Sequence, residues 1–344
     1  MYRIVADSSS NIKSETVASV PLKIITDERE FIDDETYNAN EMVSYHAGYK
    51  GRSGSACPSR EDWLDAFGDA QYVFCIAITS HLSGSYNSAR LAKEEYESDH
   101  PDRHVYVIDS LSTGGEMELI ADKLEELIAM GKSFDDICIE IEAYADKARL
   151  IFCLKSLTNL VNNGRVSAAA AKISKLLNLR IVGRASDVGE LEMHSKPRGD
   201  KNAIAEIVKY MKELGYNGGK VIISHCFAFE GAKALSHLIK EHFSNANIRI
   251  NECGALCSFY AEKVAFSSAL KADRIAINCC LCQEYMRTFL KRFSRALSKP
   301  LGKRDPLPAL SNRAGMGFFS KRFWGAGGLF RGKSPCSLNI SNIL

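Results

Sequence analysis

Short apolar runs that end in hydroxyl-rich turns recur along this chain, and this pattern constrains the fold more than any other feature. The run at residues 72–78 leads into Ser-Gly-Ser at 83–85, where a helical pattern begins. Two other runs end similarly, in Asp-Ser at residues 7–8 and 109–110. A strand that passes through a polar turn into a helix leaves unpaired N–H groups at the positive end of the helix dipole. The alternation predicts an α/β protein, and the turns predict an anion site at the ends of its strands. A capping Ser beside a turn Gly explains the same residues as ordinary structure.

Two local signals predict further elements. Pro58 ends an extended segment, and Ser59 can cap the following helix, with Asp62 at the spacing of a capping box. Residues 187–190 read Asp-Val-Gly-Glu between apolar stretches and predict a hairpin. The second half is therefore expected to contain an antiparallel sheet.

Five motifs in a fixed order resemble the DegV family of bacterial fatty-acid-binding proteins, over residues 1–263. They are Asp7-Ser8, Ser55-Ala56-Cys57-Pro58-Ser59, Leu82-Ser83-Gly84-Ser85-Tyr86, Asp109-Ser110 and Gly164-Arg165-Val166-Ser167. Family members usually read Thr-Ser-Gln-Pro-Ser at the second motif and Leu-Ser-Gly-Thr-Tyr at the third. This chain changes the neighbouring residues but keeps hydroxyls at Ser55, Ser83 and Ser85.

The resemblance implies a two-domain fold with the ligand between the domains. Residues 1–148 would form an N-terminal α/β domain with a mostly parallel sheet. Residues 149–263 would form a C-terminal α/β sandwich with an antiparallel sheet. The fold places a fatty acid in the interior, and the protein would present it to a separate fatty acid kinase. No other cofactor and no nucleic acid partner is implied.

The same resemblance assigns roles to individual residues. Ser55 and Ser83 would hold the carboxylate, with Gly84 and Ser85 in the same turn as Ser83. Arg165 would contribute charge near this head group, although a solvated arginine at a helix end explains it too. Arg198 lies in a segment that resembles a basic turn of the family, and it is a candidate for partner docking. The alternative is that Arg198 is an ordinary exposed charge.

The chain departs from the family in the segment that would lie near the carboxylate of the ligand. Many relatives carry Thr-His-Thr-Gly-Pro-Gly late in the sequence, with the histidine near the carboxylate, whereas this chain reads Gly-Ala-Leu-Cys-Ser-Phe-Tyr at 254–260. Tyr260 or Ser258 could donate a hydrogen bond instead of the histidine. A tyrosine of the core accounts for Tyr260 equally well.

A serine hydrolase is the enzymatic alternative, with Ser83 as nucleophile and His81 or His225 as base. Ser83 lies in Leu-Ser-Gly, not in Gly-x-Ser-x-Gly, and no acid partner can be assigned. The sequence therefore favours a carrier without catalytic residues.

Composition sets the frame for this interpretation. The chain has 344 residues, 46% of them hydrophobic, which suffices for two domains with full cores. It contains no signal-peptide pattern and no run of 18 apolar residues, so we expect a cytoplasmic protein.

Eleven cysteines, several in apolar strand patterns, suit reduced core thiols. The spacing Cys-Cys-Leu-Cys at 279–282 lacks the pairs of a zinc site, and we expect no metal.

Residues 264–344 differ from the rest of the chain. They contain 14 Lys and Arg against three acidic residues, a net charge of +11, whereas the first 263 residues carry −9. Aromatic and basic residues at 285–297 recur near helical spacing, which would suit contact with a membrane surface. The segment at 318–324 would suit a membrane or a nucleic acid. A disordered extension is the simpler alternative.

A third hypothesis for this tail is a reading-frame slip. Restoring one base near Lys263 converts the codons for residues 264–270 into possible codons for Gly-Gly-Leu-Leu-Ile-Gly-Phe. That sequence would suit a buried closing strand. On this hypothesis the encoded C-terminal domain lacks its last strand, which would expose apolar surface and strand edges.

Overall fold

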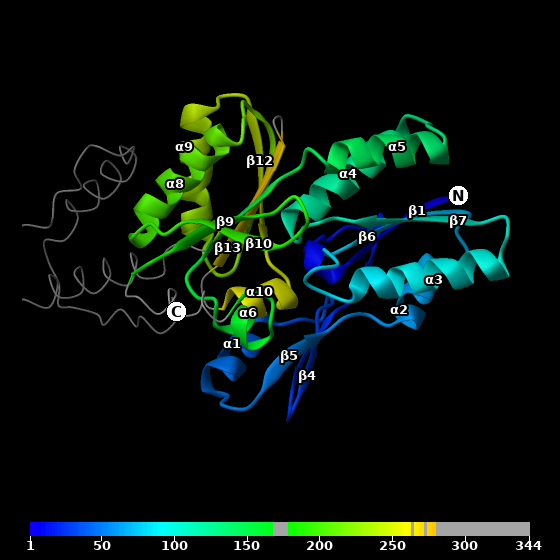
Figure 1. Cartoon of the computed structure of the whole chain (residues 1–344), viewed down its shortest axis with the longest axis horizontal. Helices are drawn as coiled ribbons and strands as arrows, with labels where there is room; N and C mark the ends of the chain where they lie inside the picture. The colour runs from blue at the N-terminus through cyan, green and yellow to red at the C-terminus, as the bar shows by residue number, and fades with distance from the viewer. Residues whose placement is uncertain (168–177, 263–264, 272–273, 280–344) are drawn as a thin grey trace, which may run out of the picture. The chain divides into compact units, whose positions relative to one another are not determined.

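A computed structural model describes residues 1–167, 178–262, 265–271 and 274–279, and all of them belong to one compact unit (Figure 1). The amphipathic segment at 285–297 lies outside these residues. The hypotheses of a membrane-binding, nucleic-acid-binding or disordered tail therefore stay predictions.

The first half of the chain is built around a four-stranded parallel sheet, as predicted. Its order is β2-β1-β6-β7, with bounds Val17–Val20, Tyr2–Asp7, Tyr72–Ala77 and His104–Asp109. Successive side chains of a strand point to opposite faces, so an almost continuously apolar strand requires cover on both sides. Val5 packs with helices α2 (Arg60–Phe67) and α3 (Ser85–Asp99). Ile4 belongs to the cluster that contains α4 (Gly115–Ala129) and α5 (Phe134–Ala145).

The order of these strands indicates where a ligand would bind at the edge of the sheet. From β1 the chain moves to one side to form β2, and β6 and β7 are added on the other side. In open α/β sheets, ligands bind beyond the carboxyl ends of the strands at such a switch point. Here the carboxyl ends are Asp7 of β1 and Ala77 of β6, which lead into the first and third polar motifs.

A small antiparallel sheet in the first half was not anticipated from the sequence. Its order is β4-β3-β5, with bounds Glu30–Ile32, Lys23–Thr26 and Ser53–Ala56. Helix α1 (Ala39–Gly48) precedes β5. This sheet matters for the site because β5 carries Ser55.

The second half contains a seven-stranded sheet that has the expected antiparallel strands and, in addition, parallel ones. The order is β10-β9-β8-β13-β14-β11-β12, with bounds Leu191–Ser195, Ile181–Ala185, Leu150–Leu154, Ala265–Lys271, Arg274–Cys279, Gly219–His225 and Ala246–Glu252. Strands β8, β9 and β10 are antiparallel, and the predicted hairpin joins β9 to β10. Strands β11 and β12 are parallel because helix α9 (Phe229–His242) connects them, and α8 (Gly199–Glu213) packs in the same core.

The expected domain boundary at residue 263 does not coincide with the end of this sheet. Residues 265–271 and 274–279 form β13 and β14, which lie between β8 and β11, with additional pairings of β14 to β8 and of β13 to β11. The expectation that the domain lacks its last strand is therefore not supported, because this stretch occupies the centre of the sheet. The reading-frame slip concerns the gene and stays a hypothesis.

The local helix signals near residue 60 were read correctly. The Ser59 side chain accepts the N–H of Asp62, and the Asp62 carboxylate accepts the N–H of Ser59, which makes a complete capping box on α2. Across the described ranges, the helices are too short or too polar to cross a membrane.

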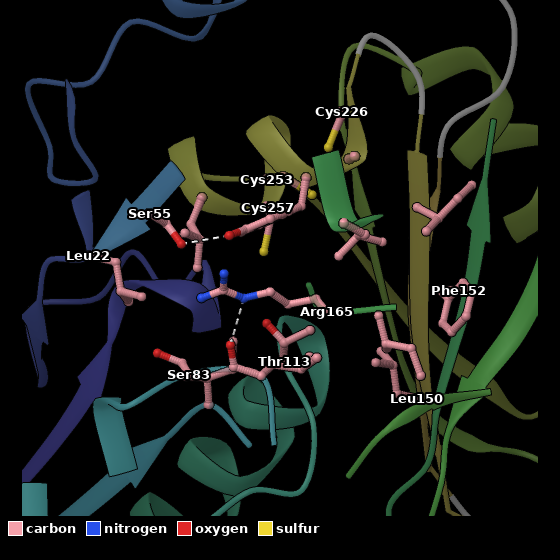
Figure 2. Close-up of a pocket in the computed structure, with 18 residues that line it drawn as sticks. Leu22, Ser55, Ser83, Thr113, Leu150, Phe152, Arg165, Cys226, Cys253 and Cys257 are labelled. Atoms are coloured by element: carbon pink, nitrogen blue, oxygen red, sulfur yellow. Dashed lines mark hydrogen bonds between the residues drawn. The ribbon is translucent and has the colours of Figure 1, made fainter. Parts of the chain in front are cut away.

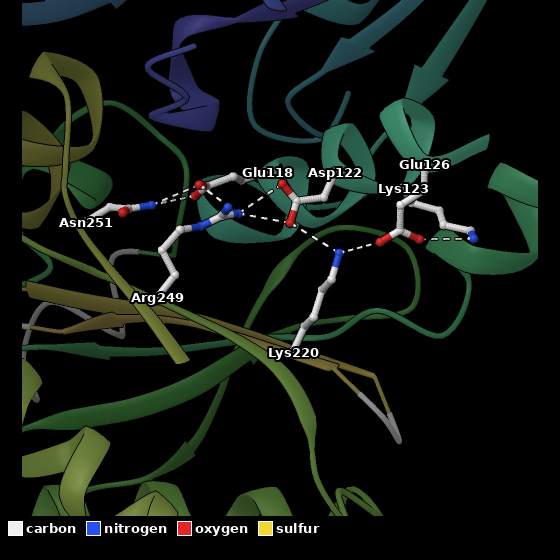
Figure 3. A network of polar contacts seen from close by, with 7 residues as sticks. All are labelled: Glu118, Asp122, Lys123, Glu126, Lys220, Arg249 and Asn251. Carbon is white, nitrogen blue, oxygen red and sulfur yellow. Dashed lines mark hydrogen bonds and ion pairs between the residues drawn. The ribbon is translucent and has the colours of Figure 1, made fainter. Parts of the chain in front are cut away.

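A charged network connects α4 to the edge of the large sheet (Figure 3). Arg249 of β12 lies 3.0 Å from both Glu118 and Asp122. Asn251 donates to Glu118, and Lys220 of β11 lies 3.5 Å from Asp122. Burial raises the pKa of Glu118 to about 7 in spite of Arg249. The network thus fixes the N-terminal sheet's helical layer against the second sheet.

Asp33 provides a second link between the two halves. Its buried carboxylate accepts the N–H groups of Ala255 and of Leu256, the latter at 3.1 Å, at the start of helix α10 (Ala255–Ala261). These N–H groups have no partner within the helix, so the carboxylate satisfies them and complements the helix dipole. Burial nevertheless raises the pKa of Asp33 to about 6. The position of α10 depends on this residue, which follows β4 far away in the sequence.

We expect Asp33→Ala to lower the free energy of unfolding by about 1–3 kcal/mol, because it leaves two buried N–H groups unpaired. Asp34→Ala is the matched control, since Asp34 is exposed and hydrogen-bonds only within its own turn, to Thr36, among the described residues. Its effect should stay within about 0.5 kcal/mol. Urea denaturation measures both, and equal losses would contradict the role given to Asp33.

Candidate ligand-binding site

An apolar cavity lies between the two halves of the described chain (Figure 2). It encloses about 750 Å³ of non-atom space, its opening included. Most of its wall is aliphatic, aromatic or thiol-bearing: Leu22, Ile78, Leu82, Leu150, Phe152, Leu154, Leu160, Leu191, Cys226, Cys253, Leu256, Cys257 and Ala261. The other lining residues are polar or charged: Ser55, Ser83, Thr113, Arg165 and Tyr260. Such a cavity suits an elongated apolar ligand with one polar end.

Ser55 and Tyr260 meet at this cavity although they are 205 residues apart. Their hydroxyls form a hydrogen bond of 2.7 Å. Ser55 comes from β5, and Tyr260 from α10, whose position Asp33 maintains. The structure thus places Tyr260 beside the first predicted carboxylate ligand, where a second hydroxyl can donate to the same anion.

Arg165 extends into the cavity between Ser55 on one side and Ser83 and Thr113 on the other, as Figure 2 shows. Its Nε donates to the carbonyl of Leu82 at 3.1 Å, and its Nη1 donates to the carbonyl of Asn163 at 2.6 Å. The guanidinium lies 5.8 Å from the centre of the Tyr260 ring. Within the described ranges Arg165 forms no ion pair, so its charge is available to an anion in the cavity.

The turn that carries Ser83 is held by a buried carboxylate. Asp7 accepts the N–H of Ile78 at 2.8 Å and the hydroxyl of Ser85 at 2.7 Å. Burial raises the pKa of Asp7, while its hydrogen bonds, including two from Ser9, act in the opposite direction. The Ser83 hydroxyl in turn accepts the N–H of Ser85 at 3.2 Å. Asp7 therefore fixes the path of the chain that brings Ser83 to the cavity.

Two residues of the predicted head-group set lie elsewhere. Ser85 is fully buried, and its hydroxyl is taken by Asp7, so it is not available to a ligand. Gly84 is exposed as the N-cap of α3 and does not line the cavity. The turn was identified correctly, but the direction of each side chain within it follows from contacts with Asp7 that the sequence does not reveal.

Arg198 lies apart from the cavity. It is exposed at the N-cap of α8, and its carbonyl accepts from Asn202. The neighbouring pair of Arg180 and Asp200, at 2.6 Å, fixes the start of this helix. Arg198 is thus presented to solvent on an ordered element.

Three features of the site were missed from the sequence. Thr113 lines the cavity and follows β7, just as Ser83 follows β6, so the repeated turn pattern could have indicated it. Asp33 carried no signal, because its partners on α10 are more than 220 residues away. The thiols of Cys226, Cys253 and Cys257 come together only in the folded chain.

The described residues do not bring together the partners of a hydrolase or of a metal site. Within them, Ser83 has no hydrogen bond to His81 or His225. His225 is buried against Phe229, and burial lowers its pKa. No group of three His, Cys, Asp or Glu side chains with the geometry of a metal site occurs in the described ranges.

Comparison with protein families gives one match over most of the chain. The family model described as "Uncharacterised protein, DegV family" matches residues 1–272. A DegV domain-containing protein of Streptococcus pneumoniae strain R6 is 40% identical over 269 residues, which cover 76% of this chain and 96% of that protein.

Solved structures agree with this match. A DegV family protein from Eubacterium eligens, loaded with heptadecanoic acid, is 38% identical with a TM-score of 0.76, covering 82% of this chain and 100% of that one. The Streptococcus pneumoniae fatty acid kinase (Fak) B3 protein, loaded with linoleic acid, is 39% identical with a TM-score of 0.77, covering 79% and 99%.

The geometry predicts that two serines of one turn have different functions. Ser85→Ala should lower the free energy of unfolding by about 1–3 kcal/mol, because it removes a donor from the buried Asp7 carboxylate. Ser83→Ala should have a smaller effect, since its hydroxyl only accepts one N–H at 3.2 Å and faces the cavity. Urea denaturation of ligand-free protein measures both variants. A larger loss for Ser83→Ala would contradict the assignment.

Proposed function

The chain belongs to the DegV family, and from this membership and the geometry of its cavity we propose that it binds a long-chain fatty acid. The carboxylate binds the hydroxyls of Ser55, Ser83 and Tyr260 and the guanidinium of Arg165. The acyl chain lies along the aliphatic wall. Gly84 and Ser85 shape the turn without contacting the ligand.

One observation carries this proposal: Arg165 extends into a mainly apolar cavity among the hydroxyls that line it, with no ion pair within the described ranges. A carboxylate taken out of water must be fully hydrogen-bonded, and each bond to a charged group contributes about 1.5–3 kcal/mol. The hydroxyls and the guanidinium together supply such bonds. A neutral lipid would leave them unpaired.

The aliphatic wall supplies the larger share of the affinity. Each buried methylene contributes about 0.8 kcal/mol, so a long chain exceeds the contribution of the head group. The head-group contacts then determine orientation and selectivity for a free acid. Two structurally similar relatives, at 38% and 39% identity, hold a C17 saturated acid and linoleic acid, which supports a long acyl chain as ligand.

The protein acts as a carrier that presents its fatty acid to a separate kinase. Its similarity to the Fak B3 protein supports this role. Arg198, exposed at the start of α8, is the proposed contact for the kinase. Buried thiols such as Cys75 and Cys153 support a reducing compartment, the cytoplasm. A hydrolase that uses Ser83 is less well supported, because among the described residues neither His81 nor His225 hydrogen-bonds to Ser83.

The first test is binding of a free fatty acid and of its methyl ester by the full chain. The double variant Ser55→Ala, Ser83→Ala should weaken binding of the acid by about tenfold for each hydroxyl removed and affect the ester much less. Mass spectrometry of small molecules released on denaturation should show a stoichiometric fatty acid from the unsubstituted chain and little from the double variant.

Ser80→Ala is the control, because Ser80 is exposed, lies in the same turn region and does not line the cavity. Equal losses for acid and ester would contradict the carboxylate site. Hydrolysis of the ester that depends on Ser83 would instead establish the enzyme.

Arg198 allows a separate test of kinase presentation. With a purified fatty acid kinase and ATP, Arg198→Glu should reduce acyl phosphate formation at least tenfold while fatty acid binding is unchanged. Lys201→Glu, an exposed charge reversal on the same helix, is the control. Equal activity of the Arg198 variant and the control would remove Arg198 from the docking surface.

A further inference from the structure

Leu150 separates the ligand cavity from a second cavity. It is the one residue that lines both cavities within the described ranges. The second cavity encloses about 1130 Å³ of non-atom space, its opening included, and lies where β7, α5 and the turn after β9 approach one another. Leu150 is 1% exposed, and because it lines both cavities it lies where they adjoin.

The packing around Leu150 agrees with this position. Its hydrophobic cluster contains Ile78 and Leu256, which line the ligand cavity, and Ile108 and Ala185, which line the second one. Leu150 thus shares one hydrophobic cluster with residues that line the ligand cavity and with residues that line the second cavity. Truncating that leucine removes the partition, while the backbone of β8 stays paired in the sheet.

Leu150 also lies away from the head group. Figure 2 shows it on the side of the cavity opposite Ser55. Leu150, Phe152 and Leu154 alternate along β8 and line the same wall. An acyl chain whose carboxylate is held at Ser55 and Arg165 can follow this wall toward Leu150.

We propose that Leu150 sets the maximum acyl-chain length, because it closes the cavity where the methyl end of the fatty acid arrives. This inference rests on the proposed function and adds a residue that determines selectivity. A chain with more carbons than the cavity accommodates must displace a fully buried side chain or leave methylenes in water.

The first residues beyond Leu150 can accept an acyl end. Ile108, Ala148 and Ala185 are apolar and line the second cavity. Glu116 also lines it, and burial raises its pKa to about 8. This carboxyl is therefore mainly neutral at pH 7. The charged residues that line the same cavity, Asp109, Glu142, Asp146, Arg149 and Asp187, are half-buried or exposed, so their charges stay in contact with water.

The experiment offers the full chain, freed of lipid, an equimolar mixture of saturated fatty acids of 14 to 22 carbons. Bound acids are quantified by mass spectrometry for the unsubstituted chain and for Leu150→Ala. Each added methylene that leaves water contributes about fourfold to affinity, so two contribute about 15-fold. We expect Leu150→Ala to make room for about two further methylenes and so to raise the bound ratio of C20 to C16 acid by about 15-fold.

Leu154→Ala is the matched control, with the same substitution on the same strand and the same wall, at a residue that lines only the ligand cavity. It should weaken binding of all lengths by similar factors and leave the ratio within about twofold. Leu150→Val, a smaller truncation that places less demand on folding, should shift the ratio in the same direction by less.

The outcomes separate this inference from the proposed function. If the unsubstituted chain binds no fatty acid from the mixture, the proposed function fails, and the inference fails with it. If it binds fatty acids but both Leu150 variants keep its ratio, or Leu154→Ala shifts the ratio equally, only the role of Leu150 is overturned.

Discussion

The buried carboxylate of Asp7 is the interaction on which the arrangement of the site depends. It lies at the end of β1 and binds groups from three places: the N–H of Ile78 after β6, the hydroxyl of Ser85 at the start of α3, and Ser9 in its own turn. A carboxylate in the interior is tolerated only when its oxygens are hydrogen-bonded. This requirement brings the ends of β1 and β6 together and leaves Ser83, between Ile78 and Ser85, facing the cavity.

Asp33 follows the same principle at the opposite wall. Its carboxylate binds the first N–H groups of α10, and that helix carries Tyr260 to Ser55. Two acidic residues of the N-terminal half thus position donors from both halves of the chain. A fatty acid carboxylate in the cavity would be a third buried carboxylate, satisfied by the same kinds of group and additionally by a guanidinium.

The cavity depends on how the two halves are held against each other. Residues from β5 and from the turns after β6 and β7 form one wall, and β8, α10 and the segment around Arg165 form the other. The network of Glu118, Asp122, Lys220 and Arg249 connects α4 to the second sheet away from the cavity. Polar contacts at several places therefore fix an interface whose centre stays apolar and available to a ligand.

The sequence by itself determined the elements, because local patterns encode them. The alternation of apolar runs and helical segments indicated an α/β fold, Ser59 and Asp62 marked the start of α2, and the turn at 187–190 marked the hairpin. The family motifs indicated Ser55, Ser83 and Arg165, and the departure from the family at 254–260 indicated Tyr260. All four line the cavity.

Only the tertiary structure decided which side chains face the ligand. Ser83 and Ser85 are equivalent in the sequence. In the structure the hydroxyl of Ser85 donates to Asp7, 78 residues earlier, so only Ser83 is left to face the ligand. Asp33 and Leu150 gain their importance from partners distant in the sequence or from a second cavity. Strands β13 and β14 were not expected, because sheet position depends on pairing with β8 and β11. Local patterns record the conformation of the backbone, whereas long-range contacts determine the direction of a side chain.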